Sequence, residues 1–186
     1  MKRDFKPPSI FKMKNKMAKF DNVAKPEDCV ELAEYAISRR QKELSLDEIE
    51  GRHQSYTLML RSMILSLSQS HFEETLYPME TRLVIYQDGD DMGWHNDYSG
   101  KDLDEARPDD CMRRYSATMY LNDTYDGGQL VLQDTEKDVP VDAVPGRVVL
   151  YAAHIIHGTR PVVGGPRVTM NMSMTHIRSE SEVASE

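Results

Sequence analysis

The sequence predicts a mainly β fold with supporting N-terminal α-helices, arranged as a β-sandwich or jelly roll. Before residue 80, apolar side chains recur at helical spacing, whereas after residue 80 short β-rich runs follow one another. Glycine-containing turn signals separate these later runs. Helices first and many short strands afterwards are typical of a sheet that carries its helices on one face.

Two helices are expected. Pro26 suits a first helical turn, and Val30, Ala33 and Ile37 then recur on one face, which predicts a helix over residues 26–44. A second helix is predicted over residues 56–70, where the shared apolar face consists of Tyr56, Leu60, Met63, Ile64 and Leu67.

Five runs of β-forming residues are expected to be strands. They cover residues 82–87, 115–121, 129–133, 147–152 and 167–173. Two polar segments, 88–110 and 134–144, interrupt these strands and are expected to be long connections, of the kind that often form lids or binding loops.

The length of 186 residues suits one domain. Its expected parts are a basic N-terminal arm (1–20), a helical support (21–79), a jelly-roll core (80–176) and a polar tail (177–186). With 39% hydrophobic and 29% charged residues, the composition is that of a folded protein rather than a disordered one.

The net charge of −8 and the pI near 5.3 disfavour a generic nucleic-acid binder, which would be basic. The two cysteines, Cys29 and Cys111, do not form a disulfide framework. The sequence contains neither a signal-peptide-like apolar run at its start nor a stretch of ~20 apolar residues, so we expect a cytoplasmic location without a membrane partner. No oligomeric state is predicted.

A metal-binding pattern lies in Trp94-His95-Asn96-Asp97. In an extended chain, residues i and i+2 project from the same face, so His95 and Asp97 can reach one ion. A third ligand must come from elsewhere in the chain. The downstream histidines are His154, His157 and His176, and His157 follows an apolar strand.

The stretch that begins ten residues after His157 alternates between polar and apolar residues. Arg167, Thr169, Asn171 and Ser173 share one face, which either points to solvent or lines a wet pocket. In a pocket, the Arg167 guanidinium would bind a carboxylate.

Two histidines and one carboxylate on one side of an iron ion form the facial triad of non-haem iron(II) oxygenases. A bidentate 2-oxo acid and O2 fill the three remaining positions. The distal carboxylate of that acid then needs a cation, and Arg167 is placed in the sequence to supply it.

In this order and spacing, residues 80–174 resemble the prolyl 4-hydroxylase-like branch of the Fe(II)/2-oxoglutarate-dependent dioxygenases. The matching segments are RLVIYQDG (82–89), WHND (94–97), ATMYLN (117–122), DGGQL (126–130), PGR (145–147), HGTRPV (157–162) and GPR (165–167). The resemblance implies a double-stranded β-helix (jelly-roll) core. It also implies Fe(II), 2-oxoglutarate and O2 as cofactor and cosubstrates, with ascorbate as a candidate reductant.

The resemblance assigns roles to individual residues. It implies that His95, Asp97 and His157 are the catalytic iron ligands, that Arg167 and Tyr120 bind the distal carboxylate of 2-oxoglutarate, and that Tyr86 lies near the iron. Strand alternation adds Thr169 and Asn171 to the cosubstrate residues. Relatives that halogenate lack the carboxylate ligand, so Asp97 favours hydroxylation.

The resemblance makes a prolyl or other residue of a peptide or protein the leading substrate. Nine carboxylates against two basic side chains in residues 88–110 indicate either a solvated acidic loop or a surface for a cationic or neutral partner. A hydroxylase of a free amino acid or small molecule is the first alternative, and a non-catalytic metal-binding jelly roll is another. A nucleic-acid demethylase is disfavoured, since such relatives carry a second arginine shortly after the cosubstrate arginine and residues 168–177 contain none.

Overall fold

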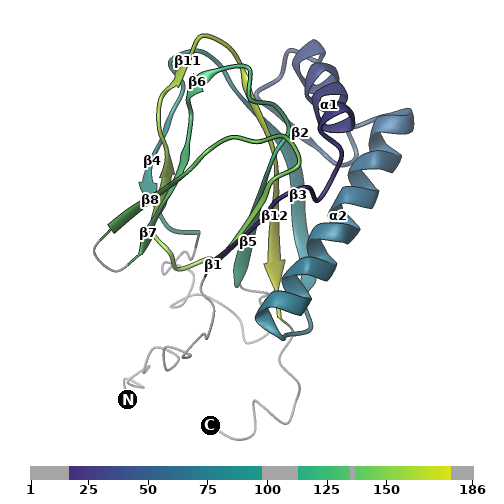
Figure 1. The fold of residues 1–186 in the computed structure, drawn as a ribbon. Helices are drawn as coiled ribbons and strands as arrows, with labels where there is room; N and C mark the ends of the chain where they lie inside the picture. The colour runs from purple at the N-terminus through teal and green to yellow at the C-terminus, as the bar shows by residue number, and fades with distance from the viewer. Residues whose placement is uncertain (1–16, 98–112, 135–136, 177–186) are drawn as a thin grey trace, which may run out of the picture.

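The fold was analysed in a computed structural model of the 186-residue chain, which describes residues 17–97, 113–134 and 137–176. The described residues form mainly antiparallel β structure, which confirms the predicted fold class (Figure 1). The larger sheet has the order β1 (Met17–Phe20), β9 (Val148–Ala152), β5 (Tyr115–Tyr120), β12 (Arg167–Thr175), β3 (Tyr77–Tyr86) and β2 (Glu43–Ser45).

A smaller sheet lies on one side of the larger one (Figure 1). Its order is β4 (Met92–His95), β10 (His157–Thr159), β7 (Leu130–Asp134) and β8 (Lys137–Val141). β6 (Asp126–Gly127) and β11 (Val162–Val163) form a separate two-stranded sheet. The space between the two sheets is therefore lined by strands that lie far apart in the sequence.

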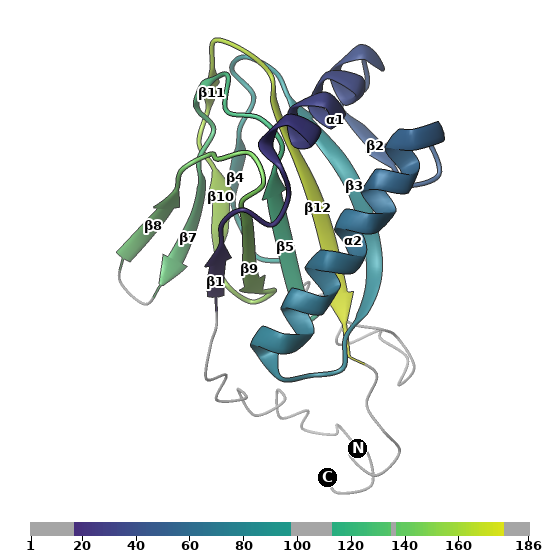
Figure 2. The same ribbon diagram turned by 45° about the vertical axis from the view of Figure 1, so that its right-hand side comes forward.

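Both helices lie on the opposite side of the larger sheet from the smaller sheet, as Figures 1 and 2 show together. α1 (Pro26–Ser38) packs on β12 and β3, and α2 (Gly51–Phe72) packs on β3. The main apolar core fills the space between the helices and this sheet. It contains Leu32, Leu60, Ile64, Leu83 and Met170, each at most 1% exposed. Burial of one such side chain contributes roughly 1.5–3 kcal/mol.

The predicted helix over 26–44 is too long at its end. α1 stops at Ser38, because Arg40 takes a left-handed backbone conformation (φ +56°) and the chain then enters strand β2. The second helix begins at Gly51, five residues before the predicted start.

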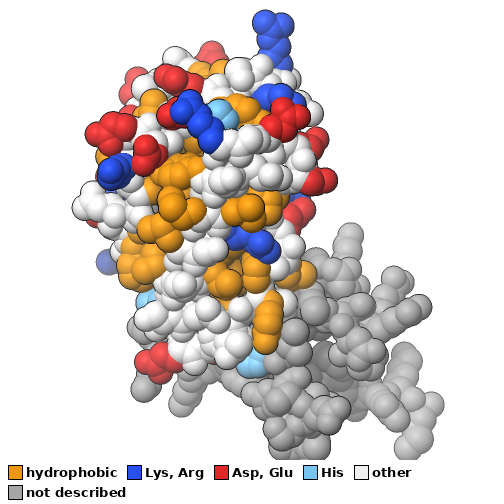
Figure 3. Space-filling model, turned by 90° about the vertical axis from the view of Figure 1, so that its right-hand side faces the viewer, with side chains coloured by type: hydrophobic (Ala, Val, Ile, Leu, Met, Phe, Trp, Pro, Cys, Tyr) orange, Lys and Arg blue, Asp and Glu red, His pale blue; other side chains and the backbone are white. Residues whose placement is uncertain are grey.

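The buried face of α2 also differs from the predicted one. It consists of Thr57, Leu60, Ile64 and Ser68. Met63 is 37% exposed, and Leu58 and Met59 of the same helix are exposed as well. Figure 3 shows apolar side chains gathered on one face of the molecule. No helix among the described residues combines the length and apolar character that crossing a bilayer requires.

Two predicted connections contain strands. Residues 137–141 of the predicted 134–144 connection form β8, which pairs with β7 as a hairpin, so that prediction was wrong. Within 88–110, residues 92–95 form β4, while residues 98–112 lie outside the described part, and so does any closure of that acidic segment over the site. Of the basic arm, residues 17–20 form edge strand β1 against β9, and residues 1–16 are outside the description, as is the tail 177–186.

Strand β12 shows why the inner surface of the larger sheet is polar. It pairs with β3 on one side and β5 on the other, so it is central in the sheet. Its apolar residues Val168, Met170, Met172 and Met174 belong to the core cluster. The polar residues of the alternate set point to the other face. That face meets the smaller sheet rather than solvent, and Arg167, Thr169 and Ser173 are buried.

Candidate metal centre and anion site

His95, Asp97 and His157 come together between the two sheets. His95 ends β4, Asp97 follows two residues later, and His157 begins β10 directly opposite His95 in the antiparallel register. One potential ligand atom from each residue lies within 4.8 Å of the others. Among the described residues, this is the group of histidine and acidic side chains that could hold a metal ion, and the rival His154 is an exposed turn residue outside it.

Both imidazoles present the nitrogen that a metal requires. His95 Nδ1 lies 2.8 Å from the Gly93 carbonyl oxygen, and His157 Nδ1 lies 2.9 Å from that of Ile155. Because a carbonyl only accepts, each Nδ1 carries the proton and donates it. Each Nε2 then keeps its lone pair, and the two Nε2 atoms lie 3.9 and 3.8 Å from the Asp97 carboxylate oxygens.

Burial also favours a neutral His157. Its side chain is 5% exposed, and desolvation lowers its pKa, although the Ile155 carbonyl and Asp97 oppose this shift. A metal-ligating histidine must be neutral, so the environment of His157 supports that form. Tyr151, whose pKa burial raises strongly, lies beside it with its hydroxyl 3.5 Å from Nε2.

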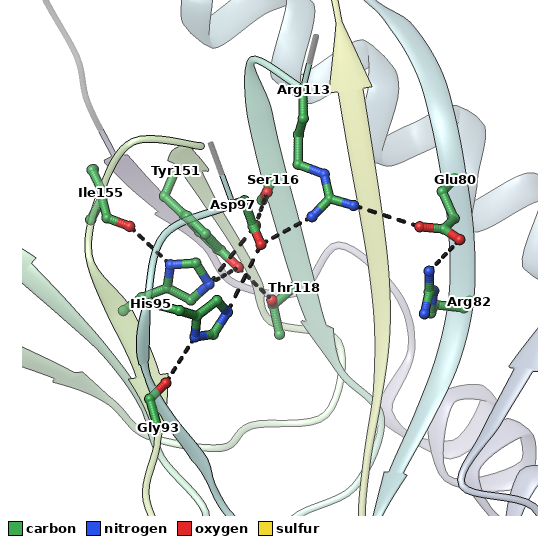
Figure 4. Close-up of polar contacts among 11 residues, drawn as sticks. Glu80, Arg82, Gly93, His95, Asp97, Arg113, Ser116, Thr118, Tyr151 and Ile155 are labelled. Atoms are coloured by element: carbon green, nitrogen blue, oxygen red, sulfur yellow. Dashed lines mark hydrogen bonds and ion pairs between the residues drawn. The ribbon is translucent and has the colours of Figure 1, made fainter. Parts of the chain in front are cut away.

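The Asp97 carboxylate is held from two sides (Figure 4). Ser116 Oγ on β5 donates a hydrogen bond to Oδ2, and Arg113 Nη1 lies 3.0 Å from Oδ1. Its backbone N–H donates to the Ala153 carbonyl at 2.9 Å. These contacts fix the carboxylate in orientation while each oxygen retains a further lone pair.

Arg167 lies at the other end of the same cavity as a buried cation. It is 2% exposed, and no carboxylate in the described part of the chain pairs with it. Its guanidinium carbon lies 5.2 Å from the ring centre of Tyr86 and 5.4 Å from that of Tyr120, and its Nε has no hydrogen-bond partner among the described residues. A buried, unpaired guanidinium is costly unless an anion joins it.

The other predicted cosubstrate residues occupy different positions around Arg167. Thr169 Oγ1 accepts a long hydrogen bond of 3.5 Å from Arg167 Nη1. The Tyr120 hydroxyl donates to the Val141 carbonyl and accepts from Leu130 N–H, both at 3.0 Å, so its ring faces Arg167 while its hydroxyl ties the two sheets together.

Sequence reasoning missed Tyr125, a further residue at Arg167. Its hydroxyl is buried without a hydrogen-bond partner in the described region, and desolvation raises its pKa while the Arg167 charge lowers it. The signal lay in the turn that follows: a Cβ at Gly128 would come within 2.9 Å of the Tyr125 ring and 3.0 Å of Arg167 Cδ. Gly128 therefore allows the two side chains to approach. Arg113, Ser116 and Tyr151 were also missed, because nothing in the local sequence shows that they meet Asp97 and His157.

One cavity of about 240 Å³ joins the metal-binding group to Arg167. Its lining includes Tyr86, Arg113, Tyr151, Asn171 and Ser173 in addition to these residues. The arrangement can hold a divalent cation at one end and an anion at the other.

Comparison with known proteins agrees with this chemistry. The family model of the 2OG-Fe(II) oxygenase superfamily matches residues 81–174, which is half of the chain. The PKHD-type hydroxylase Shewana3_0717 of Shewanella sp. (strain ANA-3) is 34% identical over 100 residues, covering 52% of this chain and 43% of the relative. The chain thus spans less than half the length of the curated relative it matches.

Two solved structures share the fold. A Pseudomonas putida prolyl-4-hydroxylase superposes with a TM-score of 0.69 at 18% identity, covering 89% of this chain and 95% of its own. A Trichoplax adhaerens prolyl hydroxylase, solved with a hypoxia inducible factor peptide fragment, gives 0.68 at 16% identity, with coverages of 93% and 88%. The family match, the shared fold and the His-Asp-His group agree, and the chain belongs to the 2OG-Fe(II) oxygenase superfamily.

Proposed function

We propose that this chain is an Fe(II)- and 2-oxoglutarate-dependent dioxygenase that hydroxylates its substrate. One observation carries the proposal: a His-Asp-His group and a buried arginine without an anionic partner in the described residues share one cavity. The group offers two neutral imidazole nitrogens and a carboxylate, which suit iron. The arginine offers a forked cation, which suits the distal carboxylate of a 2-oxo dicarboxylic acid.

The residues divide the work as follows. His95 Nε2, His157 Nε2 and the Asp97 carboxylate would hold the iron, and Ser116 and Arg113 would keep that carboxylate in place. When bound, the iron with 2-oxoglutarate and O2 supplies an oxidative decarboxylation that yields succinate, CO2 and the hydroxylated substrate.

The anion end of the cavity selects and orients the cosubstrate. Arg167 would pair with the distal carboxylate. Because this pairing removes the energetic cost of a buried guanidinium without an anionic partner, it favours cosubstrate binding. Tyr86 and Tyr120 hold the guanidinium through their rings, Thr169 through its hydroxyl, and Tyr125 offers a free hydroxyl donor to the same carboxylate. The buried surroundings exclude water and strengthen these interactions.

Hydroxylation is proposed in preference to halogenation because Asp97 supplies the third protein ligand. A non-catalytic metal-binding role would not account for a buried arginine in the same cavity, since metal binding alone needs no cation there. The leading substrate is a prolyl or other residue of a peptide, which is supported by the shared fold with the prolyl hydroxylase that was solved with a peptide fragment. We propose that residues 1–186 act as one such oxygenase domain.

The test is anaerobic titration. Fe(II) followed by 2-oxoglutarate is expected to give the weak visible charge-transfer band of the chelate. Asp97→Ala should abolish the band and Arg167→Gln should move it to higher 2-oxoglutarate concentration, whereas the exposed controls Asp138→Ala and Arg160→Gln should leave it unchanged. Absence of the band in the wild type, or its persistence in Asp97→Ala, contradicts the proposal.

A further inference from the structure

Two side chains of β12 face the cavity with hydrogen-bonding capacity that no described residue uses. Ser173 is 6% exposed and its Oγ is buried without a partner. Asn171 is partly buried, and its carboxamide oxygen is likewise buried without a partner. Both residues line the cavity. A buried polar group that stays unpaired costs about 1–3 kcal/mol, so such a pair of groups indicates a ligand.

These two residues lie between the metal-binding group and a row of ion pairs, here named the ion-paired wall and consisting of Glu43, Glu80, Arg82 and Arg113. Arg82 lies 2.8 Å from Glu43. Arg82 also pairs with Glu80, which in turn lies 3.6 Å from Arg113 (Figure 4). Two cations meet two carboxylates, so the wall has no formal net charge.

The strand register fixes this placement. Asn171 lies opposite Arg82 on β3 and Thr118 on β5, and Ser173 lies opposite Glu80 and Ser116. Ser116 in turn bonds Asp97, so the two side chains are level with the metal-binding group along the strands. Arg167 is four residues away from Asn171, roughly 13 Å along the strand at about 3.3 Å per residue. A cosubstrate anchored on Arg167 therefore approaches the metal from the other end of the cavity.

We propose that Asn171 and Ser173 bind an uncharged amide group of the substrate, such as the peptide bond next to the residue that is hydroxylated. This inference rests on the proposed function. A carboxamide offers an NH2 group with two N–H donors and an acceptor oxygen in one plane, which suits a planar amide, and the Ser173 hydroxyl can donate or accept. The expectation that Asn171 binds the cosubstrate is replaced by this one.

The ion-paired wall explains why the bound group is neutral. An α-ammonium would have to displace a guanidinium from Glu80 or Glu43, and an α-carboxylate would have to displace a carboxylate from Arg82. Each exchange breaks one ion pair to form another. The ion-paired wall therefore adds no net binding energy for a ligand of either charge. Beside the wall, the groups with unused hydrogen-bonding capacity are Asn171 Oδ1 and Ser173 Oγ, which are uncharged. The cavity therefore selects a peptide or another amide over a free amino acid.

The test uses four proline derivatives that differ in charge: N-acetylprolinamide (neutral), N-acetylproline (anionic), prolinamide (cationic) and proline (zwitterionic). The full chain is loaded with Mn(II) and 2-oxoglutarate, which prevents turnover, and dissociation constants are measured by ligand-observed NMR. We expect the neutral derivative to bind at least tenfold more tightly than the other three. Equal binding of all four, tighter binding of a charged derivative, or no binding by any of them overturns the inference.

Variants then locate the interaction. Asn171→Leu and Ser173→Ala should each remove most of the preference for the neutral derivative, and Glu80→Gln should shift the preference toward N-acetylproline because the wall becomes positive. Ser66→Ala on the exposed side of α2 is the control and should change nothing. Binding of Mn(II) and 2-oxoglutarate is measured separately in each protein. Failure of that loading in the wild type contradicts the proposed function, whereas normal loading without an amide preference contradicts this inference alone.

Discussion

The guanidinium of Arg113 bridges the Asp97 carboxylate and Glu80, with Nη1 3.0 Å from Asp97 Oδ1 and Nη2 3.6 Å from Glu80 Oε2. Arg113 precedes β5, Asp97 follows β4 and Glu80 lies in β3. The metal-binding group is thereby connected across β12 to β3 of the larger sheet.

Arg113→Gln is expected to raise the dissociation constant of Mn(II) about tenfold, and so is Ser116→Ala. Both variants release the Asp97 carboxylate from one of the contacts that orient it, and loss of a residue that positions a ligand typically costs 10–100-fold in metal affinity. Isothermal titration calorimetry on the metal-free protein measures the effect, with Arg160→Gln as the exposed control. An unchanged dissociation constant in both variants would show that Asp97 is fixed by its backbone alone.

Arg167→Met is expected to have opposite effects on stability and on cosubstrate binding. Without 2-oxoglutarate, the variant should be more stable than the wild type by roughly 1 kcal/mol, because a buried unpaired charge is removed. Addition of 2-oxoglutarate and Mn(II) should raise the melting temperature of the wild type but add nothing beyond the metal's own effect in the variant. Thermal unfolding by circular dichroism checks both, and a variant still stabilised by 2-oxoglutarate would contradict the anion site.

Gly128→Ala is expected to destabilise the protein by roughly 2–3 kcal/mol and to weaken 2-oxoglutarate binding. The residue has a left-handed backbone (φ +58°), and a new Cβ would collide with Tyr125 and Arg167. Gly164→Ala is a matched control: its φ is +79°, but a Cβ there meets nothing within 4 Å, so only the backbone penalty of about 1–2 kcal/mol remains. Equal losses of stability in the two variants would mean that the contact of a new Cβ at Gly128 with Tyr125 and Arg167 has no energetic cost.

His71→Phe is expected to reduce the loss of stability between pH 7 and pH 5 in the metal-free protein. Burial against Phe20 and Phe72 lowers the pKa of His71, so the unfolded chain takes up a proton near its ordinary pKa before the folded chain does. Stability that depends on a neutral His71 is therefore present above that pH and lost as the pH falls. Urea unfolding at both pH values measures the difference. An equal decrease in the free energy of unfolding of the wild type and the variant between pH 7 and pH 5 would exclude a contribution from His71.

Five strand runs and the metal-binding group could be predicted from the sequence, because alternation and His-x-Asp are local patterns, whereas the order of strands in the sheets could not. The predicted runs at 115–121 and 167–173 lie within one or two residues of β5 and β12. β8 was missed because Lys137, Asp138 and Pro140 are unusual in a strand, and only its edge position makes them acceptable.

The side chains that serve the site through distant contacts were not predictable. Arg113, Ser116 and Tyr151 meet the metal-binding group only after three strands have paired, and no spacing in the sequence encodes that meeting. Gly127-Gly128 next to Tyr125 is a typical turn signal, and a turn signal alone does not indicate that Gly128 makes space for the Tyr125 ring beside Arg167.

Strand β12 contributes Arg167, Asn171 and Ser173 to the cavity lining, whereas Val168, Met170, Met172 and Met174 of the alternate set belong to the apolar core. A single inserted or deleted residue between Arg167 and Ser173 would exchange the two sets, turning methionines toward the metal-binding group and an asparagine toward the helices. Changes of length in this strand are therefore forbidden, whereas replacement of Asn171 or Ser173 by another side chain leaves the core intact. At the proposed amide site, point substitutions along one strand are therefore expected to change substrate preference at little cost in folding stability.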